Sequence, residues 1–119
     1  MSVVAKYAEF AVSCRTKDHS EDELHHAKRA LIDWFACTLP GGLEEPAVLM
    51  KKALNEDIGR GKSTLLPQGE RATTRTAALI NGTASHIIEF DDIYRDGLFH
   101  PGSPIISAAL AVAEMVDSS

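Results

Sequence analysis

Two imidazoles, those of His86 and His100, lie within 15 consecutive residues of this chain. Among the carboxylates between them, Glu89, Asp91 and Asp92 are close together in the sequence. Imidazole and carboxylate groups together can hold a divalent metal ion. They can also transfer a proton beside a substrate carboxylate, with His100 as acid or base and the acidic residues orienting it. The spacing alone does not decide between these two chemistries.

The two aspartates stand in an unfavourable place for negative charge. A helical stretch expected over Thr83–Phe90 ends just before them, and the macrodipole of a helix is negative at its C-terminus. A solvated loop is the simplest interpretation, but uncompensated carboxylates at a helix end favour a functional site. We expect residues 91–102, which include Tyr94, to form an ordered loop of the kind that often carries reactive groups.

Other motifs are poor candidates for a site. His25 and His26 are adjacent on an expected helix and point about 100° apart, so they cannot easily share one metal ion. The segment Gly59–Ser63 resembles a phosphate-binding loop, but that pattern needs a glycine where this chain has Glu56. The two cysteines form no CxxC pair, which argues against a zinc site built on cysteine.

Composition limits the class of protein. The 119 residues carry 12 basic and 17 acidic side chains, a net charge of -5, without a cluster of Lys and Arg, so we expect no nucleic-acid partner. The N-terminus lacks the basic and apolar regions of a secretory signal. No apolar run approaches the roughly 20 residues that a membrane span needs. We therefore expect a cytoplasmic protein that does not enter a membrane.

Apolar periodicity predicts an all-α fold with about five helices joined by ordered loops. The clearest start is the capping box of Ser20 and Glu23. We read residues 57–70 as a loop with one short extended piece at residues 64–66, and Asn81-Gly82 as a stop or a tight break. The helices are expected at 3–13, 21–39, 46–55, 74–80 with a continuation at 83–90, and 105–116.

The last predicted helix, 105–116, is apolar on nearly every side. Such a helix is stable when it is buried all round, and a few small helices can hardly cover it. This predicts a homo-oligomer, or association with a partner chain, through this helix.

Several segments together resemble the MmgE/PrpD family. They are Asn81–Asp92, His100-Pro101-Gly102, Ala108–Glu114, Arg29–Asp33 and Ser63–Leu66, and they cover nearly the whole chain in order. The family includes 2-methylcitrate dehydratase, cis-aconitate decarboxylase and iminodisuccinate epimerase. The resemblance implies the N-terminal part of a large helical domain, usually dimeric, and proton removal or delivery beside a carboxylate of a small di- or tricarboxylic acid, with no required metal or organic cofactor.

The resemblance also implies roles for individual residues. Glu89 and His100 match active-site positions, and Asp91 and Asp92 match the acidic pair beside them, where a structural or orienting role is expected. We also predict that His86 and Tyr94 bind substrate. Ile93 stands where several members have Thr, and Gly102 stands where the dehydratase branch has Ser, so dehydratase, decarboxylase and epimerase remain open.

Enzymes of the family are several times longer than this chain, and their substrate-binding lysines come from later sequence. We therefore expect residues 1–119 to be a partial domain of a lyase or isomerase, inactive alone. The alternative is a non-catalytic helical module that docks on a partner through residues 105–116. A third hypothesis, a metal-binding protein using His86, Asp91, Asp92 and His100, is disfavoured by the resemblance, which implies neither metal nor cofactor.

Overall fold

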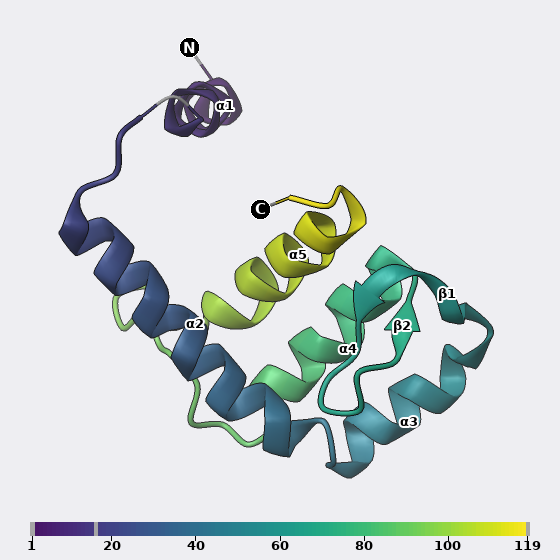
Figure 1. Ribbon diagram of the computed structural model, residues 1–119. Coiled ribbons are helices and arrows are strands. Elements are labelled where there is room, and N and C mark those ends of the chain that lie inside the picture. Colours follow the sequence, from purple (N-terminus) through teal and green to yellow (C-terminus); the bar gives the residue numbers. More distant parts are fainter. Residues whose placement is uncertain (1, 16, 119) are drawn as a thin grey trace.

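The structure is a computed structural model that describes residues 2–15 and 17–118 (Figure 1). Within these residues the chain forms five α-helices, one short 3-10 helix and a two-stranded antiparallel sheet. The elements are α1 (Val3–Cys14), α2 (Glu21–Gly41), α3 (Glu45–Ala53), a 3-10 turn (Asn55–Asp57), β1 (Ile58–Thr64), β2 (Arg71–Ala72), α4 (Thr74–His86) and α5 (Gly102–Met115).

The small sheet corrects the expectation of an all-α fold. The segment expected to be mostly loop forms β1, which pairs with β2 so that Thr64 lies opposite Arg71. Contacts with α5 fix this strand: the Ser63 hydroxyl donates to the carbonyl oxygen of Ala111 at 2.7 Å, and the Thr64 N–H donates to the Glu114 carboxylate at 2.7 Å. These bonds span about fifty residues, and local sequence patterns do not reveal them.

Helix α2 begins as predicted and ends two residues later than expected. Both bonds of the capping box between Ser20 and Glu23 are present. At the other end, Gly41 still belongs to the helix and lies directly against the backbone of α4. A Cβ atom on Gly41 would lie 1.9 Å from the carbonyl oxygen of Ala84. Glycine at this position therefore allows α2 and α4 to pack backbone against backbone.

Helix α4 is continuous through Asn81-Gly82, so the expected stop or break is wrong, and the helix ends at His86 rather than at Phe90. Asn81 is 6% exposed. Its side chain accepts from the Leu66 N–H at 3.0 Å and donates to the Thr64 carbonyl oxygen at 2.8 Å. The asparagine thus bonds the turn after β1, and its side chain does not compete with the helix backbone as it does in helix-breaking contexts.

The core lies where α4, α5 and the sheet meet. A tryptophan ties α2 to this core, because the Trp34 indole N–H donates to the Ser107 hydroxyl of α5 at 2.9 Å, with both side chains buried. The buried cluster is formed mostly by small side chains, which lets the elements approach closely. Its members are Leu65, Ala72, Ala77, Ile80 and Ala111.

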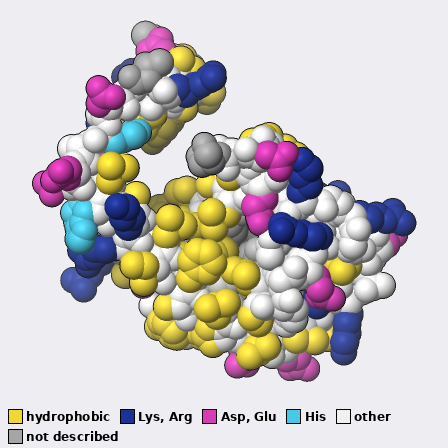
Figure 2. Space-filling model, in the orientation of Figure 1, with side chains coloured by type: hydrophobic (Ala, Val, Ile, Leu, Met, Phe, Trp, Pro, Cys, Tyr) yellow, Lys and Arg dark blue, Asp and Glu magenta, His cyan; other side chains and the backbone are white. Residues whose placement is uncertain are grey.

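A large apolar surface remains exposed. Helix α1 lies apart from the other elements (Figure 1) and buries none of its side chains. Hydrophobic side chains also gather over α2 and α5 on the face that Figure 2 shows. On these two helices Ile32 is 69% exposed and Ile105 is 61% exposed. None of the helices among the described residues combines the length and the apolar character required to cross a bilayer.

Candidate functional site

One buried carboxylate faces two imidazole rings. Asp91, whose side chain is 3% exposed, lies in the loop between α4 and α5. The Nδ1 atom of His86 is 3.1 and 3.2 Å from its two carboxylate oxygens, and the Nδ1 atom of His100 is 3.3 Å from Oδ1. The two ring centroids are 4.6 Å apart. The structure therefore brings together three of the six residues predicted to form the site.

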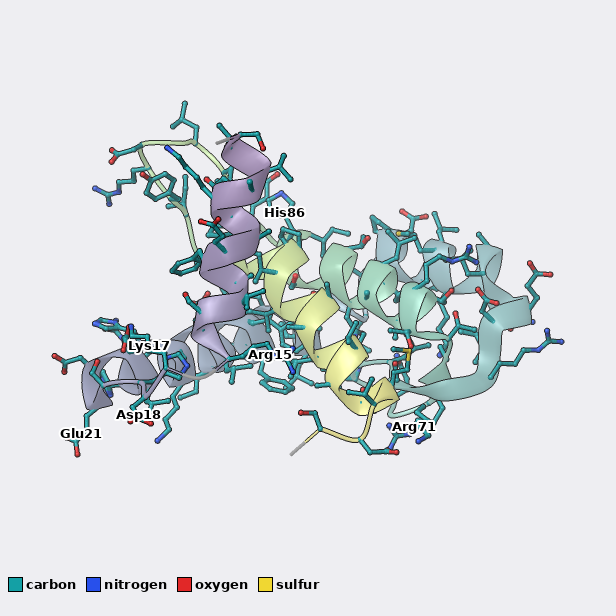
Figure 3. The ribbon with its side chains drawn as sticks, turned by 90° about the horizontal axis from the view of Figure 1, so that it is seen from above. Arg15, Lys17, Asp18, Glu21, Arg71 and His86 are labelled. Atoms are coloured by element: carbon teal, nitrogen blue, oxygen red, sulfur yellow. The ribbon has the colours of Figure 1, made fainter. Side chains whose placement is uncertain are left out.

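The cluster lies at one end of the helix pair α4 and α5. His86 is the last residue of α4, and His100 precedes the first residue of α5 by two positions. Figure 3 shows His86 at the end of these helices from which the connecting loop extends, with Arg71 at the opposite end. The Ser103 hydroxyl of α5 donates to the Gly82 carbonyl oxygen of α4 at 2.7 Å and holds the two helix ends together.

His100 approaches Asp91 without forming a hydrogen bond. Its Nδ1 atom is buried and lacks a hydrogen-bond partner among the described residues, although the distance to Asp91 is that of an ion pair. A buried polar atom without a partner is uncommon in folded proteins. In apo active sites, however, catalytic hydrogen bonds are often long or poorly aligned. The ring is thus close to, but not yet in, the orientation in which Asp91 would accept its proton.

Asp92 has a different partner from Asp91. Its two carboxylate oxygens accept from the Gly102 N–H, the first of α5, at 2.9 and 3.2 Å. Negative charge at a helix N-terminus is favourable, so this contact compensates a carboxylate that also follows the end of α4. A Cβ atom on residue 102 would lie 2.5 Å from Asp92 Oδ1, and Gly102 therefore leaves room for this contact.

The remaining two predicted site residues lie outside the cluster. Glu89 is exposed, has a backbone φ of 51°, and forms no side-chain hydrogen bond or ion pair within residues 2–15 and 17–118. Tyr94 is 53% exposed, and its N–H donates to the Phe99 carbonyl oxygen in a turn of the loop. The structure does not place either side chain against His100. Their roles stay predictions.

Two open grooves adjoin the loop that carries the cluster. His86 lines an open groove between α4 and α5 together with Arg75 and apolar side chains of both helices. Asp92 lines a second groove with Arg29 of α2.

Burial, and after it the nearby carboxylates of Asp33, Asp91 and Asp92, raises the pKa of the Cys37 thiol to about 11. Cys37 is therefore a neutral packing residue behind the loop.

Sequence reasoning missed the pairing of His86 with Asp91. The two residues are five positions apart, across the end of a helix, and the sequence-based prediction assigned His86 to substrate binding instead. The signal that could have found the pair is the helix end itself: a residue in the last turn and a carboxylate just beyond it can meet when the chain reverses after the helix. The left-handed backbone of Glu89 lies between them.

Residues 5–119 match the MmgE/PrpD N-terminal domain, and the chain belongs to the MmgE/PrpD family, which confirms the resemblance found in its motifs. The chain is also similar to the cis-aconitate decarboxylase-like protein oryM of Aspergillus oryzae, with 26% identity over 114 residues. The matched region covers 96% of this chain and 24% of that relative. The chain thus spans about a quarter of the length of the curated relative that it matches.

Proposed function

We propose that this domain belongs to an enzyme that transfers a proton at the carbon next to a carboxylate of a small di- or tricarboxylic acid. Membership of the MmgE/PrpD family and the likeness to a cis-aconitate decarboxylase-like protein support this class of substrate. The single structural observation that carries the proposal is the buried Asp91 carboxylate facing the Nδ1 atoms of His86 and His100. The outcome of the reaction, whether dehydration, decarboxylation or epimerisation, is left open.

In this proposal His100 is the acid–base residue. A buried carboxylate that accepts from Nδ1–H fixes the tautomer of an imidazole and leaves the lone pair on Nε2. A small rotation of the His100 ring converts its 3.3 Å approach to Asp91 into such a hydrogen bond. Nε2 then takes the proton from the carbon next to the substrate carboxylate, and Asp91 stabilises the imidazolium that forms.

Glu89 completes the proton transfer in this scheme. Loss of hydroxide needs a proton donor for the leaving oxygen, epimerisation needs one on the opposite face of the carbon, and decarboxylation needs one for the carbanion. Glu89 is exposed and free of side-chain partners among the described residues. We propose that the Glu89 carboxyl group delivers this proton to the substrate once the site is assembled.

Substrate binding needs cations that this cluster does not hold. Charge-assisted bonds from Lys or Arg are the usual way to bind a substrate carboxylate. Arg75 lines a groove with His86 but is already ion-paired with Asp57 at 3.2 Å. We propose that further groups outside residues 1–119 complete the site and that this chain alone is inactive. Turnover of a tricarboxylate at an ordinary enzymatic rate by the purified chain would contradict this.

The test is His100→Ala in the whole enzyme that contains this domain. Removing an acid–base residue lowers the rate by about 10²–10⁴-fold, and we expect the helical circular dichroism to stay unchanged. The matched control is His25→Ala, because His25 is exposed on α2 and its ring neighbour is His26 rather than the site. Unchanged turnover in His100→Ala would remove His100 from the mechanism.

A second candidate function is supported by the apolar surface of α5. Ile105, Val112 and Val116 are 61%, 46% and 58% exposed, which favours a non-catalytic module that docks on a second copy or on a partner chain. Two measurements together distinguish the two candidate functions: the oligomeric state of the purified chain by light scattering, and the activity of the whole protein. A stable oligomer that Val112→Asp dissociates, combined with an inactive whole protein, would favour the module.

A further inference from the structure

The proposed reaction gives His86 no step of its own. We propose that His86 is a positioning residue, which holds the Asp91 carboxylate in the orientation that His100 needs as acid or base. This role rests on the proposed function, because it belongs to the same proton transfer. It differs from the sequence-based prediction that His86 binds substrate, since the imidazole acts through Asp91 and not on the substrate itself.

His86 is the one hydrogen-bond partner of the Asp91 side chain within residues 2–15 and 17–118. Its Nδ1 atom lies 3.2 Å from Oδ1 and 3.1 Å from Oδ2. Because a carboxylate only accepts hydrogen bonds, this nitrogen carries the proton. The Asp91 side chain is 3% exposed, and a buried carboxylate that loses its donor is unfavourable where it stands. The orientation of Asp91 therefore depends on His86.

The donor belongs to a helix, whereas the acceptor lies in a loop. His86 is the last residue of α4, and its carbonyl oxygen accepts from the Glu89 N–H at 2.9 Å. The Ser103 hydroxyl, which donates to the Gly82 carbonyl oxygen at 2.7 Å, holds this end of α4 against α5. Side chains on rigid elements define a geometry more precisely than side chains on loops. The end of α4 thus supplies a fixed point for the loop carboxylate.

The position in which His86 holds Asp91 is one that His100 can use. Oδ1, which makes the longer of the two contacts with His86, lies 3.3 Å from the Nδ1 atom of His100. A carboxylate oxygen has two lone pairs, so Oδ1 can accept from both rings. The His100 nitrogen is buried and lacks a hydrogen-bond partner among the described residues, so Asp91 is the group able to orient it. Loss of the His86 contact lets the carboxylate rotate, and His100 then loses this acceptor.

The two possible roles of His86 use different ring nitrogens. Positioning of Asp91 uses Nδ1. Binding of substrate would use Nε2, because Nδ1 is committed to the carboxylate and the side chain is 47% exposed beside the groove between α4 and α5. Asn carries its amide nitrogen on Cγ, the atom that carries Nδ1 in histidine, whereas the amide nitrogen of Gln lies one bond further out, as Nε2 does. Replacement by these two amides therefore tests the two nitrogens separately.

The test compares His86→Gln with His86→Asn in the whole enzyme that contains this domain. We expect His86→Gln to lower kcat by about 100-fold, the loss that a misplacement of about 1 Å causes, with KM nearly unchanged because no contact to the substrate is lost. His86→Asn is expected to recover most of this loss. His25→Gln, on the exposed part of α2, is the matched control and is expected to turn over as the parent does. Equal rates for the two His86 variants, a higher rate for Gln, or a rise in KM at unchanged kcat would overturn the positioning role.

His86→Gln in the His100→Ala background separates this role from the proposed function. Residues that act as one unit give losses that do not multiply, so we expect no further loss of turnover in the double variant. Losses that multiply would overturn the role of His86 and leave that of His100 intact. Unchanged turnover in His100→Ala alone would remove the proposed function, and the role of His86 with it.

Helical circular dichroism of each variant separates a positioning defect from a folding defect. Where His86→Gln loses helical content, His86→Asn is compared with the parent instead. It keeps a donor at the place of Nδ1, so its kcat should stay within about tenfold of the parental value. A larger loss in a variant with unchanged helical content would overturn the role.

Discussion

Replacement of Asp92 by Asn is expected to destabilise the fold through a single lost charge. The carboxylate accepts from the Gly102 N–H with both oxygens, at 2.9 and 3.2 Å, at the positive end of α5. An amide at the same place keeps an acceptor oxygen and loses the charge. The substitution therefore separates the contribution of the negative charge from that of the hydrogen bond and of side-chain size.

The expected magnitude follows from two overlapping effects. A hydrogen bond to a charged group contributes about 1.5–3 kcal/mol and a neutral one about 0.5–1.5 kcal/mol. The helix dipole contributes about 0.3–1 kcal/mol, part of which is already included in the charged bond. We expect Asp92→Asn to lower the free energy of unfolding by about 1–1.5 kcal/mol, and Asp92→Ala, which removes the acceptor, by about 2–3 kcal/mol.

The assay is urea unfolding followed by circular dichroism at pH 7. With a slope of about 1–3 kcal/mol per molar urea, the midpoint for Asp92→Asn falls by roughly 0.3–1.5 M. Asp96→Asn is the matched control: it removes the same charge from the same loop, and Asp96 is exposed without side-chain partners among the described residues. Equal midpoints for the two variants would refute the reasoning, because only Asp92 contacts α5.

Three further predictions concern other titratable groups. The Thr76 hydroxyl, which donates to Asp57 at 2.6 Å, holds the pKa of Asp57 below its ordinary value of 3.8. The stability that the ionised Asp57 carboxylate contributes is present above its unfolded pKa and is lost as pH falls through 3.8 toward the folded pKa. The urea midpoint of the parent should therefore exceed that of Asp57→Asn at pH 7, and the two midpoints should converge as the pH falls below 3.8. A difference that stays constant with pH would contradict this. With the pKa of Cys37 raised to about 11, a disulfide-exchange reagent at pH 8 should label Cys14 in the native chain and both thiols in denaturant, and equal native rates would disprove it. Glu89→Gly should raise the unfolding free energy by about 0.5–1 kcal/mol, because glycine adopts the left-handed backbone conformation without steric cost. The same substitution should lower the turnover of the whole enzyme. Undiminished turnover would exclude a proton-transfer role for Glu89.

The features that could be predicted from sequence depend on local signals. The capping box of Ser20 and Glu23 fixes the start of α2, because both of its bonds join residues three positions apart. The family could be identified because its motifs lie in order along nearly the whole chain, and the match over residues 5–119 confirms it.

The features that could not be predicted depend on contacts between distant segments. Gly59–Ser63 has the composition of a turn and becomes part of a strand, because Ser63 and Thr64 bond to α5. Asn81 carries a helix-breaking signal and lies inside a helix, because its side chain bonds to the turn after β1. Local propensity is a weak prior that tertiary bonds override, and both corrections have this cause.

The candidate site shows the same division. The dipole argument assumed a helix that ends directly before the two carboxylates, whereas α4 ends at His86. The sequence also could not show that each carboxylate finds a separate partner. Asp92 is compensated by the N-terminus of α5, which is a structural contact. Asp91 lies against the Nδ1 atoms of His86 and His100. Imidazole is the commonest acid or base in enzymes, so this arrangement could take part in chemistry. The residue pair that looked equivalent in sequence therefore has two functions in the fold.

Glu89 gives a different kind of argument for function. It follows the end of α4 with a φ of 51°, a position where helices commonly end in glycine. A residue with a side chain costs about 1–2 kcal/mol in this conformation. Its side chain recovers none of this cost through a hydrogen bond or ion pair within the described residues. A strained conformation that no local contact compensates favours a role in binding or catalysis. The carboxylate of Glu89 is exposed at the start of the loop that holds Asp91 and His100. A substrate, or another part of the enzyme, could contact it there.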